Sequence, residues 1–207
     1  NFHDDVSIDA VVQESFMGLE EFQFLVPNVF GSETIFLDQL NFSGTLSEYA
    51  VDSIRINYEK SNFLGSFTFN TSKDASKLTI QELSINPKDI QTLFQSLEKS
   101  SVEVLKRFEK ANIIGTLASQ SANHKLNLSV GSPLGPLQFN FDFYRKGRQM
   151  NSFYDGQIRA SQFNIGSLLN QPDLGTTDAS LIVQGKGLQF DQLNTKLYGQ
   201  LSSLSYR

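Results

Sequence analysis

The stretch LQFNFDFYRKGRQMNSFYDGQI, residues 137–158, decides the fold because it opens with strict alternation of apolar and polar side chains. Such alternation is typical of a β-strand with one face toward a core and the other toward water. The two faces are Leu137, Phe139, Phe141 and Phe143 against Gln138, Asn140, Asp142 and Tyr144. What covers the aromatic face is then the central question: a second sheet, a helix, or a molecule that is not protein.

The same period of two residues runs through most of the chain. It predicts roughly a dozen strands, joined by short turns that carry Gly, Asn, Ser or Asp. Short turns between neighbouring strands favour hairpins and hence an antiparallel meander. The one-sided apolar positions that we expect to share a face with residues 137–143 are Ile54, Ile56, Tyr58, Phe63, Phe67, Phe69, Leu126, Leu128 and Val130; the segment at 36–42 is expected to add Phe36, Leu40 and Phe42.

One segment, at about 87–110, has helical spacing instead. Asn86 can cap the helix, Pro87 suits its first position, and Asp89 suits its positive end. The spacing predicts one amphipathic helix of about six turns. Either it covers a stretch of apolar sheet as a plug, or it is a movable gate; its apolar side chains are Ile90, Leu93, Phe94, Leu97, Val104, Leu105 and Phe108. A short helical turn is also predicted at 164–170.

Glycines recur at an interval near 70 residues, at Gly44, Gly115 and Gly185, and similar sequences surround them. Repeats of this length, each with several strands, favour an elongated stacked architecture. We therefore predict one segment, residues 1–207, built as a curved antiparallel sheet whose apolar face lines a U-shaped groove. The ordinary alternative is a β-sandwich, in which a second sheet buries that face.

Composition restricts the function. The net charge is −5, with no concentrated basic surface, which argues against nucleic-acid binding. No apolar run reaches the roughly 18 residues that a membrane-spanning helix needs. The chain has no Cys, which excludes thiolate chemistry and disulfides. The sequence begins and ends in mid-pattern, so we expect it to be a piece of a longer chain.

Candidate catalytic and metal-binding residues are sparse. The histidines are His3 and His124, and their spacing suggests no metal site or catalytic triad. Ser96 and Lys99 match S-x-x-K, but they fall on the predicted helix without the partner motifs of serine acylases. We expect no catalytic residue, no metal and no cofactor.

The C-terminal half, from Tyr154 onward, resembles the TamB family of AsmA-like translocation and assembly modules, in its Bacteroidota form. The resemblance is carried by a Y-x-G strand at 154–156, FNIGSLL at 163–169, a D-L-G turn at 173–175 and G-x-G at 185–187. Upstream, LNFSGTL at 40–46 and IIGTL at 113–117 are similar to the preceding region of such proteins.

The resemblance implies a long periplasmic protein of a Gram-negative bacterium, anchored in a membrane through a segment outside this sequence. Its hydrophobic groove would carry phospholipid acyl chains between the inner and outer membranes. It would also support outer-membrane protein assembly with a barrel partner of the TamA or BamA type. Two other functions stay open: a scaffold or chaperone that accepts strands from outer-membrane or secreted proteins, and a β-solenoid surface passenger.

Overall fold

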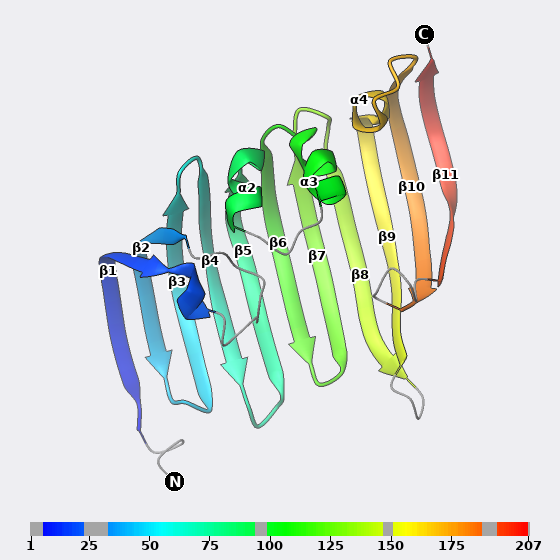
Figure 1. The fold of residues 1–207 in the computed structure, drawn as a ribbon. Helices are drawn as coiled ribbons and strands as arrows, with labels where there is room; N and C mark the ends of the chain where they lie inside the picture. Colours follow the sequence, from blue (N-terminus) through cyan, green and yellow to red (C-terminus); the bar gives the residue numbers. More distant parts are fainter. Residues whose placement is uncertain (1–5, 23–32, 94–98, 147–150, 188–193, 207) are drawn as a thin grey trace.

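The computed structural model describes residues 6–22, 33–93, 99–146, 151–187 and 194–206. These residues form one antiparallel sheet of eleven strands, and the order of the strands in space is their order in the chain. The sheet is open and gently curved, with β1 and β11 at its two edges (Figure 1). The strands are β1 (Ile8–Gly18), β2 (Thr34–Gly44), β3 (Glu48–Tyr58), β4 (Ser61–Asn70), β5 (Ala75–Ile85), β6 (Ala111–Gln120), β7 (Asn123–Gly131), β8 (Leu137–Lys146), β9 (Asn151–Asn164), β10 (Leu174–Lys186) and β11 (Asn194–Tyr206).

Short polar turns join strands at the lower end of the sheet in Figure 1, which we call the turn end. Residues 45–47 connect β2 to β3, residues 71–74 connect β4 to β5, and residues 121–122 connect β6 to β7. Side chains close these turns: the backbone N–H of Lys73 donates to Asn70 Oδ1 at 2.9 Å. Asp74 and Ser121 adopt positive φ angles of 45° and 52°, which polar turn residues tolerate.

All helical segments lie at the opposite end, the helix end (Figure 1). The 3₁₀ segment η1 (Leu19–Phe22) follows β1, α2 (Pro87–Leu93) and α3 (Lys99–Lys106) follow β5, and α4 (Ile165–Leu169) follows β9. Four strands therefore separate one helical segment from the next. Gly44, Gly115 and Gly185 lie in β2, β6 and β10, the first strands after the helical segments. The 70-residue repeat itself stays a prediction.

The prediction of one helix over 87–110 is wrong in its extent. The structure has two short helices, α2 and α3, and residues 94–98 between them lie outside the described residues. The second helix ends at Lys106, because the next three residues tighten into a turn. The N–H groups of Arg107 and Phe108 each donate to the carbonyl three residues back, at 3.1 and 3.0 Å. Glu109 then takes a φ of 54°, which turns the chain toward β6.

The short helix predicted at 164–170 is present as α4. The side chain of Asn164 caps its first turn by accepting from the N–H of Ser167 at 2.9 Å. Asn170 ends it in the left-handed conformation, with φ 56°.

Irregularities of the strand register decide which residues share a face. In β2, residue 38 is an extra residue between the pairs Leu37–Ile56 and Gln39–Arg55. An extra residue shifts the alternation by one, so side chains before and after it exchange faces. The expectation that Phe36 shares a face with Leu40 and Phe42 is therefore wrong: Phe36 lies on the opposite face, 5.3 Å from the ring of Phe16.

The described residues contain no second sheet, which contradicts the β-sandwich alternative and confirms the open, elongated antiparallel sheet. Among them, no large side chain has less than 2% of its surface exposed. The accessible surface is 13427 Å². A compact protein of this mass would expose roughly 9,700 Å². The surplus is what a sheet without a covering layer leaves in contact with solvent.

Candidate functional site: the apolar face of the sheet

Residues that lie directly opposite each other on paired antiparallel strands point to the same face. Following these pairs from β1 to β11 therefore gives rows of side chains that cross the whole sheet. The central row contains no polar side chain: Val12, Leu40, Ile54, Gly65, Ile80, Gly115, Leu128, Phe139, Ile158, Leu181 and Gly199.

The rows on either side of the central row are also apolar. The row toward the turn end is Ala10, Phe42, Val51, Phe67, Leu78, Leu117, Leu126, Phe141, Gly156, Val183 and Leu197. The row toward the helix end is Ser15, Leu37, Ile56, Phe63, Leu83, Ile113, Val130, Leu137, Ala160, Ala179 and Leu201. Only Ser15, at the β1 edge, is polar. We call these three rows the apolar band.

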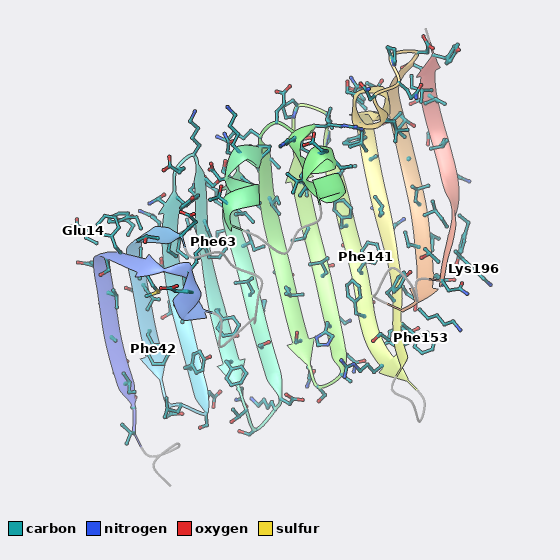
Figure 2. All side chains as sticks on the ribbon, viewed as in Figure 1. Glu14, Phe42, Phe63, Phe141, Phe153 and Lys196 are labelled. Atoms are coloured by element: carbon teal, nitrogen blue, oxygen red, sulfur yellow. The ribbon has the colours of Figure 1, made fainter. Side chains whose placement is uncertain are left out.

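The dimensions of the apolar band follow from sheet geometry. Eleven strands have ten spacings of about 4.8 Å, so the band extends for roughly 48 Å across the strands. Three rows, two residues apart along each strand, span about 14 Å between Cα atoms and about 20 Å with side chains. The band is thus a long strip perpendicular to the strands. Figure 2 labels three of its members, Phe42, Phe63 and Phe141, on β2, β4 and β8.

Apart from Phe36, the structure brings the side chains predicted to line a groove onto this one face. Most belong to the apolar band, and Tyr58, Phe69 and Phe143 extend the face beyond it. Sequence analysis did not list the contributions of β1, β5, β6, β9, β10 and β11. In β5 and β9 the signal was obscured, because extra residues interrupt the alternation between Ile80 and Leu83 and between Ala160 and Phe163.

Rings in the band lie flat over glycines of the same face. A Cβ atom added at Gly156 would overlap the ring of Phe141 on the neighbouring strand, and one added at Gly65 would overlap Phe63. The Phe141 ring also stacks on Phe143, with centroids 5.9 Å apart. Covering a strand glycine with a neighbouring ring keeps the backbone shielded from water. These two rings therefore lie over the backbone of the sheet instead of projecting away from it.

Much of the band is partly accessible to solvent, although Leu37, Val51 and Val183 are buried. Its side chains shield one another, yet Leu117 is 39% exposed in the middle of the sheet, and Leu197 and Leu201 are 61% and 60% exposed near the edge. A contiguous apolar surface this large is unusual on a soluble domain and marks a binding surface.

Among the described segments, α2 and α3 cover the helix end of the sheet over the ends of β5–β8 (Figure 1). In α3, Val102 is 3% exposed, and the Phe108 ring after it contacts Phe163 of β9 with centroids 6.2 Å apart. An Arg107 guanidinium N–H donates to the carbonyl of Leu168 in α4. The first turn of α2 is held by Asp89, whose carboxylate accepts from the hydroxyl of Ser61 at 2.7 Å and from the N–H of Lys60 at 3.1 Å.

The residues predicted to form a gate differ in position and exposure. Leu105 and Phe108 are half-buried at the helix end, and Val104 is exposed. Ile90 and Leu93 belong to α2, whereas Phe94 and Leu97 lie outside the described residues. Asp89 lies in the first turn of α2, as predicted, and its carboxylate also binds the β3–β4 turn. Whether the helices move stays a prediction.

At the turn end the same face becomes partly polar. Ser76, Ser119 and His124 lie side by side on β5, β6 and β7, between Phe69 on one side and Phe143 on the other. The Nδ1 atom of His124 is 2.8 Å from the hydroxyl of Ser119.

Aromatic residues continue this border on both sides. Tyr154 passes over Gly185 so that its hydroxyl lies 2.5 Å from Thr195 Oγ1 on β11. On the other side is Tyr49, and burial raises the pKa of its phenol. These residues form a border of hydroxyl, imidazole and aromatic groups along the band.

The opposite face is the solvated face of an antiparallel sheet. Its residues pair across strands, as in Lys125–Asp142 at 3.7 Å and Arg55–Asp38 at 3.3 Å. The Gln157 amide donates to the Ser180 hydroxyl at 3.0 Å. Shallow hollows lie mostly over this face, and one of about 930 Å³ lies at the turn ends of β2–β7. Their lining is a mixture of small and polar residues without a convergent reactive set.

Within the described ranges, no three His, Asp or Glu side chains are grouped so that they could hold a metal ion. None of the described helices has the length and apolarity required to span a membrane. Comparison of the chain with protein-family models, with curated proteins and with solved structures finds no match.

Proposed function

We propose that this chain is a non-enzymatic lipid-carrying segment, whose apolar band binds the acyl chains of phospholipids. The observation that carries the proposal is the continuity of the band: three adjacent rows cross eleven strands with one polar residue, and the described residues supply no layer to cover them. An ordinary core is buried by its own chain, whereas the described residues leave this apolar face without a second layer.

The energetics favour a hydrocarbon as that molecule. Transfer of a methylene from water to an apolar surround gains about 0.8 kcal/mol. A chain lying on an open sheet is covered on one side only, so about half of this gain is available. For about sixteen carbons the gain is on the order of 6 kcal/mol per acyl chain, and about twice that for a two-chain lipid. Since the attraction is not directional, such a lipid could move along the band without leaving it.

The resemblance to the TamB family supports the wider setting of the proposal. In that setting the segment belongs to a periplasmic bridge protein that moves phospholipid between the inner and outer membranes. The same protein assists outer-membrane protein assembly with a TamA-like or BamA-like barrel, through regions outside this sequence. The open band and the elongated sheet suit such a bridge, because additional strands would lengthen the same track.

The proposal is tested by recovery of lipid and by photo-crosslinking. The chain is purified from a Gram-negative host and examined by native mass spectrometry, and a photo-reactive amino acid is placed at Phe139 or, as control, at Asn140 on the opposite face. Bound phospholipid and crosslinks from position 139 alone are expected. Absence of lipid together with equal crosslinking from both positions would refute the proposal.

A second candidate function, a scaffold that accepts a strand from an unfolded polypeptide, is favoured by the β11 edge. All thirteen residues of β11 are exposed, and beyond it the described residues provide no further strand. A free strand edge of this length can pair with an extended peptide. Crosslinks from β11 to polypeptide, with none to lipid from Phe139, would favour this function over lipid carriage.

A further inference from the structure

We infer that a phospholipid on the apolar band has one orientation, with its phosphate at the turn end on Ser76, Ser119 and His124 and its acyl ends toward the helices. This inference rests on the proposed function and adds to it the headgroup subsite. It follows from the difference between the two long borders of the band.

The helix-end border is covered by α2 and α3 over the ends of β5–β8 (Figure 1), and its charged side chain Asp89 is already paired. Val102 and Leu134 are 3% and 7% exposed there, and the rings of Phe108 and Phe163 are in contact. The buried carboxylate of Asp89 is already occupied by Ser61 and Lys60. A phosphate at this border would lose its hydration and meet a carboxylate, which is unfavourable on both counts.

The turn-end border is open and offers hydroxyl and imidazole groups toward the apolar face. The Nδ1 atom of His124 contacts Ser119, while within the described part of the chain its Nε2 atom has no hydrogen-bond partner. The half-buried hydroxyl of Ser76, two strands away, has no hydrogen-bond partner among the described residues either. Three neighbouring strands therefore present polar side chains in one line directly beyond the band, and those of Ser76 and His124 each have an atom without a partner among the described residues.

Positive charge lies at the same place. Lys73 lies in the β4–β5 turn, three residues before Ser76, whereas the side chain of Lys77 points to the solvated face. Neither lysine forms an ion pair with another described residue. Phosphate accepts hydrogen bonds from hydroxyl and imidazole groups and is attracted to ammonium groups. The band between the two borders, about 20 Å wide, is comparable with the length of an extended acyl chain.

The orientation is tested by fluorescence quenching in the purified chain. The absence of Cys allows single labels at Ser121→Cys, in the β6–β7 turn, and at Pro133→Cys, between β7 and β8 at the helix end. Phosphatidylcholine carries a nitroxide either on its headgroup or near the end of an acyl chain. The headgroup nitroxide should quench the label at 121 several-fold more than the label at 133, and the acyl-end nitroxide should do the reverse.

Equal or inverted quenching, with lipid bound, would overturn the orientation but leave the proposed function intact. Absence of bound lipid in the same samples would instead overturn the proposed function. The two failures are therefore distinguishable, because lipid content is measured independently by mass.

The headgroup chemistry is tested by competition between phosphatidylglycerol and a diacylglycerol with the same acyl chains, read as a ratio by native mass spectrometry. The unmodified chain should prefer the phospholipid several-fold. Ser76→Ala combined with His124→Phe should bring the ratio near one without reducing diacylglycerol binding, while His124→Gln should keep part of the preference. An unchanged ratio in the double variant would overturn the subsite, and reduced binding of both lipids would show a structural role only.

Discussion

A charged residue introduced in the middle of the apolar band tests whether the band is an open binding surface or a conventional core. Phe141→Asp is the sharpest such change, because Phe141 lies in the row next to the centre, on β8, with band members of β7 and β9 beside it. In a closed core the substitution would bury a carboxylate without a partner. On an open face the carboxylate stays hydrated.

The expected loss of folding stability is small for a change of this kind. The ring of Phe141 stacks on Phe143 and shields Gly156. Loss of contacts with the cross-strand neighbours Leu126 and Gly156 costs about 0.2–1 kcal/mol each, so the variant should lose about 1–2 kcal/mol of unfolding free energy. Truncation of a Phe in a packed core costs about 3–5 kcal/mol before any charge is buried.

Lipid binding should respond far more strongly than stability. An acyl chain crossing position 141 would have to displace water from the carboxylate, and an unpaired carboxylate loses several kcal/mol on desolvation. Urea unfolding monitored by circular dichroism measures the first quantity, and native mass spectrometry of bound phospholipid measures the second. Asn140→Asp is the matched control, because it adds the same charge one residue away on the solvated face.

Two results would refute this reasoning. A stability loss above about 4 kcal/mol would show that Phe141 is covered by protein. Lipid content equal to that of the Asn140→Asp control, at unchanged stability, would show that the band is not where the acyl chains lie.

Three further changes test the sheet itself. Gly156→Val should displace the Phe141 ring and lower the unfolding free energy by about 1–3 kcal/mol, because the added side chain overpacks the site. The loss is measured as a lower urea midpoint, and an unchanged midpoint would show that the ring has room to move. Asp89→Ala should cost about 1–3 kcal/mol by leaving the Ser61 hydroxyl without its acceptor, with the loss seen as faster amide hydrogen exchange at the helix end and not at the turn end. The Ser203 hydroxyl and the backbone N–H of Gln162 lower the pKa of Asp178, so its contribution to stability is complete above the usual aspartate range and is lost as pH falls through the lowered pKa. Asp178→Asn should flatten the acid limb of a stability–pH curve, and an identical limb in both proteins would contradict this.

The face-forming strands could be predicted from the sequence wherever alternation is unbroken. Leu126 to Val130 and Leu137 to Phe143 alternate without interruption, and the structure places them on one face. The predicted face of Phe36 was wrong because β2 contains an extra residue at position 38. Such an irregularity depends on how β2 pairs with β3 and cannot be recognised in the sequence of β2 alone. A residue inserted into a ladder reverses every later side chain, so one local event determines a whole strand.

The helical segment shows a different limit of sequence reasoning. Spacing alone predicted a helix through residue 110, whereas α3 ends at Lys106 so that the chain can enter β6. The helical pattern of apolar residues continues to Phe108, but the connection to β6 ends the helix at Lys106. The sequence also could not predict the border of hydroxyl and imidazole groups, because it forms only when three strands are aligned in register. Its residues are Ser76, Ser119 and His124.

The spacing of the helical segments has a consequence for the evolution of length. Four strands separate each helical segment from the next, and an even number of strands returns the chain to the end from which it started. Duplication or loss of such a module would change the span by about 19 Å while preserving chain direction and the cross-section of the sheet. The length of such a protein could be adjusted to the distance between two compartments by changing the number of modules, without changing any single module.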